Sequence, residues 1–259
     1  MSDLAVGRDG GVLSLTIDRE DKRNALSRDV LQGLLDGVHT ATEDERVTVV
    51  VVSSAGEKVF SAGADLSVMA NDATGLEQHE GRGLLKDLVV AVRTCPKPVV
   101  ARVQGLCLAG GIGLAAGCDV VLARETAAFG MPEVERGLWP FMVSALLTRH
   151  MSPKHAMDYM LTGERFDART AYAMGLVSRV FPADTFDADV AAYVEKLANA
   201  APVAVRLGKA AWVAAAETAP LPAALEAMQA QLSLLTTTKD VAEGIAAFFE
   251  KRPPEWTGR

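Results

Sequence analysis

Residues 99–123 read VVARVQGLCLAGGIGLAAGCDVVLA, and this stretch decides the fold class. The β-branched residues at its start predict a buried strand at residues 99–103. The run DVVLA predicts a second strand at residues 119–123, and Gly110 and Gly111 open a helical segment between the two. Two strands joined through a helix need a crossover connection, which places them parallel in one sheet.

The same order of strand and helix extends towards the N-terminus. Strands are predicted at residues 11–17 and 47–54, where apolar residues alternate or form a β-branched run. One helix is predicted from the N-cap residue Ser27 to about residue 42, and another over residues 76–93. The sequence therefore predicts an α/β fold with a mainly parallel sheet.

The C-terminal quarter of the chain has a different character. Beyond Asp184 it is rich in alanine and helical in pattern almost to Phe249, with breaks near prolines. We expect an α/β core over residues 1–185 and a helical region over residues 186–259.

Composition narrows the classes of function. The chain has 259 residues, with 26 Lys and Arg against 33 Asp and Glu, and its net charge is −7. A net acidic chain without a basic cluster argues against a nucleic-acid partner. The most apolar stretch, residues 103–118, contains five glycines. It is too short for a membrane helix of about 20 residues, so no membrane partner is expected.

The cysteines indicate the compartment. Cys95, Cys107 and Cys118 form no CxxC pair, and no histidine lies at ligand spacing from them. This pattern speaks against a disulfide framework and against a metal site. Because the N-terminus also lacks a basic segment followed by an apolar one, we expect a cytoplasmic protein.

Three segments follow predicted strands and are candidates for chemistry. They are FSAGADL at residues 60–66, in a predicted loop, then residues 105–113, and FGMPE at residues 129–133. Ligands bind beyond the carboxyl ends of strands in open α/β sheets. Two backbone N–H groups that converge on one oxygen form an oxyanion hole, and Glu133 is the natural proton-transfer group. Close packing is the alternative explanation for the glycines, and the first turn of a helix is the alternative for Glu133.

The glycine-rich segment also resembles the cofactor loop of short-chain dehydrogenases. That family needs the loop near the N-terminus and a catalytic Tyr four residues ahead of a Lys. None of the three tyrosines, Tyr159, Tyr172 and Tyr193, has a Lys four residues later. The nicotinamide hypothesis is therefore disfavoured, since a single glycine pattern is a weak signal.

Taken together, six motifs resemble the crotonase (enoyl-CoA hydratase/isomerase) family over nearly the whole chain. They are DKRNALS (21–27), FSAGADL (60–66), GLCLAGGIGLAAGCD (105–119), FGMPE (129–133), LTGE (161–164) and AMGLV (173–177). The resemblance implies a crotonase (ClpP-like) spiral of ββα units with a helical C-terminal trimerisation region. It also implies homotrimers or dimers of trimers and acyl-CoA thioester substrates, with coenzyme A as part of the substrate and no separate cofactor.

The resemblance also assigns site residues. The oxyanion-hole N–H groups are those of Ala64 and Gly110, and the acid/base is Glu133. The residues expected to contact the coenzyme are Lys22, Arg23, Ala25, Ala62, Ala64, Asp65, Leu66, Ser67, Phe248 and Lys251. Family members often carry Lys at the position of Ser67, so Lys22 or Arg23 could replace that phosphate contact. A solvated terminal cation is the alternative for Lys251.

The segment after Glu133 departs from the family, because it carries bulky residues where many members have a glycine-rich turn. Trp139 is a candidate for the wall of the acyl pocket. For Phe141 and Met142 we expect core packing beneath the following helix.

A second departure concerns the catalytic acids. Hydratases of the family have two glutamates, and the first aligns with Gly113, which has no side chain. Glu135 is a possible substitute. We expect an enoyl-CoA hydratase-like enzyme that adds water across the C2=C3 bond of 2-enoyl-CoA, in fatty-acid or related acyl-CoA metabolism. A Δ3,Δ2-enoyl-CoA isomerase that uses one glutamate is one alternative, and a non-catalytic acyl-CoA-binding protein is another.

Overall fold

The computed structural model describes residues 3–65, 75–216 and 219–259. Its larger sheet has the order β1-β2-β3-β5-β7-β10, in which β1 is the antiparallel edge strand and the other neighbours are parallel. The strands of this sheet are β1 (Leu4–Asp9), β2 (Val12–Ile17), β3 (Val49–Ser54), β5 (Val99–Val103), β7 (Val120–Arg124) and β10 (Arg179–Phe181). The predicted parallel sheet is confirmed.

A second, smaller sheet has the order β4-β6-β8-β9. Its strands are β4 (Val59–Ser61), β6 (Leu106–Leu108), β8 (Ala128–Gly130) and β9 (Arg165–Asp167). The first three are parallel to one another, and β9 pairs with β8 in the antiparallel sense. The prediction of a loop between β3 and residue 66 is wrong at β4, because a strand of three residues is too short to show an alternating pattern.

The helices complete a repeated unit. They are α1 (Arg28–Glu43), α2 (Gly75–Thr94), α3 (Gly110–Gly117), α4 (Phe141–His150), α5 (Pro153–Thr162), α6 (Ala168–Ala173), α7 (Phe186–Ala198), α8 (Pro202–Ala211), α9 (Leu221–Leu235) and α10 (Lys239–Glu250). Short 3₁₀ turns form η1 (Glu20–Lys22) and η3 (Pro132–Arg136), and η4 (Trp212–Ala216) is a π-helix. The order β1-β2-α1, β3-β4-α2, β5-β6-α3 and β7-β8-η3-α4 is the predicted succession of ββα units.

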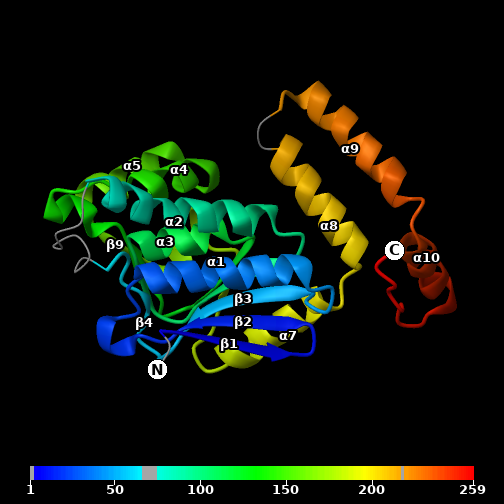
Figure 1. Ribbon diagram of the computed structural model, residues 1–259, viewed down its shortest axis with the longest axis horizontal. Helices are drawn as coiled ribbons and strands as arrows, with labels where there is room; N and C mark the ends of the chain where they lie inside the picture. Colours follow the sequence, from blue (N-terminus) through cyan, green and yellow to red (C-terminus); the bar gives the residue numbers. More distant parts are fainter. Residues whose placement is uncertain (1–2, 66–74, 217–218) are drawn as a thin grey trace.

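The larger sheet is covered on both faces, which explains the continuous apolar run of β3. Val50 and Val52 belong to the main core together with residues of α1 and α2. Val49 and Val51 face the other way and pack in a second cluster with Phe186 of α7. Figure 1 shows α1 and α2 on one side of the sheet and α7 on the other. Burial of each such side chain contributes about 1.5–3 kcal/mol relative to exposure.

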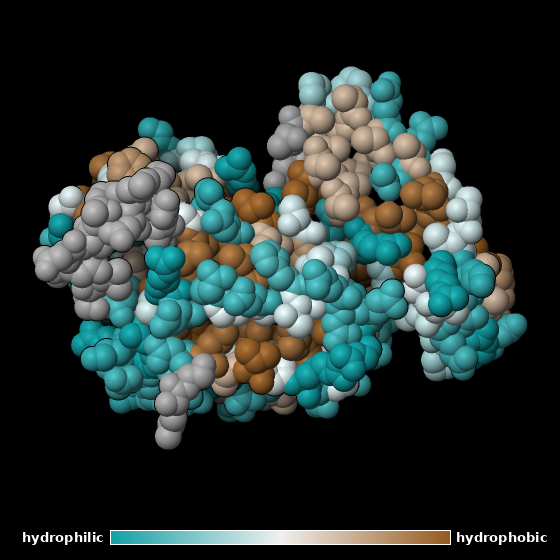
Figure 2. Space-filling model, viewed as in Figure 1, coloured by the Kyte–Doolittle hydropathy of each residue, from teal (hydrophilic) through white to brown (hydrophobic). Residues whose placement is uncertain are grey.

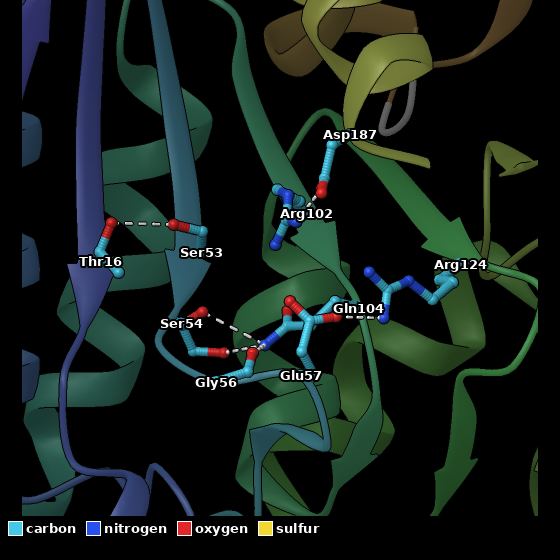
Figure 3. Close-up of polar contacts among 9 residues, drawn as sticks. All are labelled: Thr16, Ser53, Ser54, Gly56, Glu57, Arg102, Gln104, Arg124 and Asp187. Atoms are coloured by element: carbon cyan, nitrogen blue, oxygen red, sulfur yellow. Dashed lines mark hydrogen bonds and ion pairs between the residues drawn. The ribbon is translucent and has the colours of Figure 1, made fainter. Parts of the chain in front are cut away.

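A buried glutamine links the two sheets (Figure 3). Gln104 lies between β5 and β6 and is 0% exposed. Its Nε2 donates to the carbonyl oxygen of Gly56 at 2.9 Å and to Oγ of Ser54 at 2.9 Å. These contacts hold the β3–β4 connection beside the β5–β6 connection, so that β4 and β6 enter the second sheet together.

The last three helices extend to one side of the core (Figure 1). Lys209 of α8 attaches them, because its Nζ donates to Oδ2 of Asp119 at 2.6 Å and to the carbonyl oxygen of Val92 at 2.9 Å. Figure 2 shows apolar side chains gathered over α8 and α9. The predicted boundary at residue 185 stays a prediction, and α7, which follows it, packs on the sheet. No helix in the described ranges is long and apolar enough to cross a bilayer.

Candidate active site

The second sheet places the three predicted segments at one edge. Strands β4, β6 and β8 are parallel neighbours. Ala64 follows the end of β4, Gly110 follows the end of β6, and Glu133 follows the end of β8. Because parallel strands end at the same edge, residues distant in sequence come together there.

The N–H group of Ala64 points away from its strand partner. Leu26 forms a parallel bridge with Ala64, in which the Leu26 N–H donates to the Gly63 carbonyl oxygen at 2.8 Å. The Asp65 N–H donates to the Leu26 carbonyl oxygen at 3.2 Å. Successive peptide groups of an extended chain point in opposite directions, so the Ala64 N–H is directed to the other side of the segment. No acceptor among the described residues takes this N–H.

The N–H group of Gly110 lies beside that of Ala64. Gly110 is the first residue of α3, where backbone N–H groups have no partner within the helix and the helix dipole is positive. A Cβ atom placed on Gly110 would lie 3.5 Å from the Ala64 nitrogen, and one placed on Gly63 would lie 3.1 Å from the Gly110 nitrogen. The two backbone segments are therefore in contact, and small residues leave both amides accessible.

Ala109 orients the Gly110 amide through a strained backbone. Its φ of 52° and ψ of −125° are uncommon for a residue with a side chain. The Ala109 N–H donates to the Gly130 carbonyl oxygen at 2.9 Å, which fixes the end of β6 against the end of β8. The strained turn at Ala109 is thus hydrogen-bonded to β8, the strand that precedes Glu133.

Glu133 has an environment suited to proton transfer. It is the second residue of η3, which begins at Pro132 after the buried Met131. Its Oε2 atom is buried and has no hydrogen-bond partner among the described residues. Burial raises the pKa of the Glu133 carboxyl above its ordinary value of 4.5, although its own backbone N–H and the nearby Arg136 partly oppose this shift. A carboxylate oxygen that is shielded from water and lacks a hydrogen-bond partner is a better base than a solvated one.

The position of the second family glutamate is apolar in this chain. A Cβ atom on Gly113 would lie 3.3 Å from Cγ2 of Val143 and 3.6 Å from Cδ2 of Leu85. Glu135 is not a buried substitute for the missing carboxylate, because its side chain is exposed. Its Oε2 lies 3.7 Å from Nη1 of Arg136. Among the carboxylates of η3, Glu133 is therefore the half-buried one, and it follows β8, the strand that pairs with β6.

The predicted coenzyme-contacting residues of the N-terminal half lie together. The Ala62 N–H donates to the Arg23 carbonyl oxygen at 3.0 Å, so the turn after η1 runs beside the segment that follows β4. This pairing brings together Lys22, Arg23, Ala25, Ala62, Ala64 and Asp65. The side chains of Lys22 and Arg23 are exposed. Leu66 and Ser67 lie outside the described residues.

Arg19 is a residue of this region that the sequence analysis missed. Its Nη2 lies 3.0 Å from Oδ2 of Asp65, and its Nη1 donates to the Ala25 carbonyl oxygen at 2.7 Å. A single arginine in a polar loop carries no local signal of such a role. Only the pairing of the two segments reveals it.

Phe248 and Lys251 lie far from the other site residues within one chain. Phe248 lies in the last turn of α10 and Lys251 is its C-cap residue, and Figure 1 places α10 at the far end of the C-terminal helices. Phe248 is 77% exposed. One chain alone does not bring these two residues to Ala64, Gly110 and Glu133.

The residues after η3 differ from the prediction. Trp139 is half-buried and packs against the main core. The expectation that Phe141 and Met142 pack in the core is wrong, because Phe141 is 77% exposed and Met142 is 41% exposed. The buried face of α4 is formed by Val143, Leu146 and Leu147 instead, and the helical period turns the first two residues away from it.

Comparison with known proteins agrees with this geometry. Residues 7–259 match the family described as Enoyl-CoA hydratase/isomerase. The 2,3-dehydroadipyl-CoA hydratase of Escherichia coli (strain K12) is 36% identical over 260 residues, which is 100% of both chains. The crotonyl-CoA hydratase of Syntrophomonas wolfei subsp. wolfei is 33% identical over 239 residues, covering 92% of this chain and 91% of the relative.

Solved structures extend the likeness to the whole architecture. A crystal structure of enoyl-CoA hydratase from Bacillus anthracis has a TM-score of 0.93 and 30% identity, covering 99% of this chain and 100% of that one. The match includes the ββα core and the C-terminal helices. The chain belongs to the enoyl-CoA hydratase/isomerase family.

Proposed function

We propose that the protein is an enoyl-CoA hydratase that adds water across the C2=C3 bond of 2-enoyl-CoA thioesters. The observation that carries this proposal is the close approach of the backbone segments of Ala64 and Gly110 at the strand edge after which Glu133 also follows. The hydratase names of relatives such as the Escherichia coli and Syntrophomonas wolfei proteins support it. In this proposal the enzyme is a lyase of fatty-acid or related acyl-CoA metabolism.

The proposed mechanism uses the two amides for charge and Glu133 for the proton. The thioester carbonyl oxygen accepts hydrogen bonds from the N–H groups of Ala64 and Gly110. Glu133 takes a proton from water as the water oxygen bonds to C3, and the C2=C3 electron pair moves to form an enolate on the carbonyl oxygen. Glu133 then returns the proton to C2. Each oxyanion donor of this type contributes about 10²–10³ in rate.

The Gly113 position favours a second candidate, a Δ3,Δ2-enoyl-CoA isomerase. Moving a double bond needs one group that removes a proton from C2 and returns it to C4, with no water to orient. The apolar contacts of Gly113 with Val143 and Leu85 leave Glu133 without a second buried carboxylate at that place. The same enolate and the same two amides serve this reaction.

One experiment separates these activities. The purified protein is incubated with crotonyl-CoA, with a 3-enoyl-CoA and with a carboxylate-terminated 2-enoyl-CoA. Hydration removes the absorbance of the conjugated thioester, whereas isomerisation of the 3-enoyl substrate creates it. Glu133→Gln removes the activity in either case, and Glu135→Gln, a matched change on the same 3₁₀ turn, retains it. Binding of every thioester without turnover would support a non-catalytic acyl-CoA-binding protein instead.

We also propose that the C-terminal helices form a homotrimer, alone or paired as a dimer of trimers. The C-terminal helices carry large apolar side chains that are more than half exposed and that a second copy would cover, namely Trp212, Leu221 and Leu225. A hollow of about 480 Å³ lies between α8 and α10, with Ile245, Phe248 and Trp256 among its lining residues. Assembly of this kind is needed if Phe248 and Lys251 are to reach coenzyme A, since they lie far from the other site residues of their own chain.

Light scattering after size exclusion measures the assembly directly. A trimer or hexamer is expected, and Leu225→Asp is expected to shift it towards monomers. A wild-type monomer at micromolar concentration contradicts the trimer.

The proposed compartment is the cytoplasm, which the sparse buried cysteines support. Coenzyme A enters as part of the substrate, and the proposed steps require no further cofactor.

A further inference from the structure

Arg19 makes three hydrogen bonds or ion pairs in three directions. Its side chain is 12% exposed. Nε lies 2.7 Å from Oδ2 of Asp3, Nη1 donates to the Ala25 carbonyl oxygen at 2.7 Å, and Nη2 donates to Oδ2 of Asp65 at 3.0 Å. A planar guanidinium holds such partners in fixed directions, and bonds to carboxylates are about twice as strong as neutral ones.

The backbone around Arg19 is fixed as well. Its N–H donates to Oδ1 of Asn24 at 3.0 Å, and its carbonyl oxygen accepts from the Asn24 N–H at 2.8 Å. Asn24 is fully buried, and its Nδ2 donates to the carbonyl oxygens of Ala55 and Val59. The guanidinium therefore extends from a rigid base.

Two of the three partners belong to the segments that form the candidate site. Asp65 directly follows Ala64, and Ala25 directly precedes Leu26, which forms the parallel bridge with Ala64. Arg19 thus connects Asp65, which follows the amide donor Ala64, to Ala25 on the paired segment. The backbone pairing holds the main chain of Asp65, and the ion pair with Arg19 also restrains its side chain.

We propose that Arg19 is a positioning residue, which aims the Ala64 N–H at the thioester oxygen by holding Asp65 and Ala25. This inference rests on the proposed function, because it assumes that the Ala64 amide stabilises an enolate. It predicts that loss of Arg19 weakens enolate stabilisation more than it weakens binding of the coenzyme.

The test compares Arg19→Met, Arg19→Lys and the matched control Arg8→Met. Arg8 pairs with Asp44 at 3.4 Å on the exposed surface of β1, so the control removes an arginine ion pair away from the site. The probe is acetoacetyl-CoA, whose enolate absorbs in the near ultraviolet. Titration with pH gives the apparent pKa of the bound probe without any turnover. The Kd for free coenzyme A and kcat with the active thioester are measured alongside.

The wild type is expected to favour the bound enolate, and Arg19→Met to reduce this preference. A displaced donor lowers the rate by about 10- to 100-fold, so kcat is expected to fall by that factor. The Kd for free coenzyme A is expected to change by less than about threefold, since uniform binding is retained. Arg19→Lys recovers part of the loss, and Arg8→Met behaves as the wild type.

Other results overturn the inference. Arg19 has only a structural role if the bound probe has the same apparent pKa in Arg19→Met as in the wild type. The same conclusion follows if Arg19→Met weakens coenzyme binding and enolate stabilisation by equal factors. A wild type that does not favour the enolate overturns the proposed function and the inference with it. If Arg19→Met does not fold, Asp65→Ala is used, which removes the carboxylate that Arg19 binds. Unchanged enolate stabilisation in Asp65→Ala then contradicts the proposal.

Discussion

The space beside Gly113 is occupied by Val143, since a Cβ atom on the glycine would lie 3.3 Å from Cγ2 of the valine. Leu85 closes the same space from α2, at 3.6 Å from that Cβ position. The place where family hydratases carry a glutamate is therefore a packed apolar contact between helices. The chain has neither a carboxylate at this place nor the polar surroundings that a carboxylate needs.

A glutamate introduced at this place is expected to destabilise the fold. Gly113→Glu puts a carboxyl group among apolar side chains without a hydrogen-bond partner, which costs about 2–4 kcal/mol. Urea unfolding at pH 7 measures the free energy of unfolding of both proteins. Gly113→Ala is the control, and its small methyl group is expected to cost less than about 1.5 kcal/mol. A Gly113→Glu protein as stable as the wild type would mean that the contact is looser than the distances indicate.

The activity is expected to depend on the ionised form of Glu133. Burial raises the pKa of this carboxyl above 4.5, so the base is progressively lost as the pH falls through that raised value. The acid limb of the kcat/KM profile should therefore lie above pH 4.5. Glu133→Gln removes the proton transfer and should lower kcat by about 10²–10⁴. Glu135→Gln should leave both the rate and the acid limb in place, and an acid limb that persists in Glu133→Gln contradicts the assignment.

The same carboxyl is expected to reduce stability at neutral pH. Its folded pKa is raised above the unfolded value, so its favourable contribution is complete only below pH 4.5 and is lost as the pH rises through the folded pKa. Glu133→Gln, which has no charge to bury, should then be more stable than the wild type at pH 8. The gain should disappear below pH 4.5. Thermal unfolding at both pH values measures it, and an equal effect at the two values argues against a buried charge.

Removal of Lys209 is expected to leave the Asp119 carboxylate, whose side chain is 27% exposed, without its nearest cation. Nζ of Lys209 lies 2.6 Å from Oδ2 of Asp119, and the lysine side chain is 11% exposed. Burial already raises the pKa of Asp119 despite the opposing Lys209 charge. Lys209→Met should lower the free energy of unfolding by about 1.5–3 kcal/mol, as the loss of hydrogen bonds to a charged group does.

A double-mutant cycle checks this interaction. Lys209→Met combined with Asp119→Asn should lose less stability than the sum of the single changes, because the unpaired charge is gone. Lys154→Met is the control, since this lysine is exposed at the start of α5. Additive losses would mean that Lys209 stabilises the protein through its carbonyl contacts and packing, and not through Asp119.

Sequence patterns predicted the elements that are buried on both faces or that carry a clear cap. The run that becomes β3 is apolar throughout because α1 and α2 cover one face and α7 covers the other. Ser27 accepts the Val30 N–H as the predicted N-cap of α1. The strands β4, β6, β8 and β9 were missed because three residues are too few for a period to appear.

The site itself was predictable in its parts and not in its assembly. The family resemblance named Ala64, Gly110 and Glu133, but their proximity depends on the pairing of β4, β6 and β8, which no local pattern reveals. Arg19 was missed for the same reason, since its partners are separated from it in sequence. Phe141 was wrongly expected in the core because an apolar residue at the start of a helix does not tell which way the helix faces.

The short sheet also bears on how such an enzyme changes over evolution. In the proposed site, each of its three parallel strands leads to one functional group, with an amide after β4, an amide after β6 and a carboxylate after β8. A substitution just beyond β8 can alter the fate of the proton while the anion-stabilising pair stays where it is. New reactions on this scaffold are then reached by exchanging the group that ends one strand, and an inserted residue within a strand would disturb all three at once.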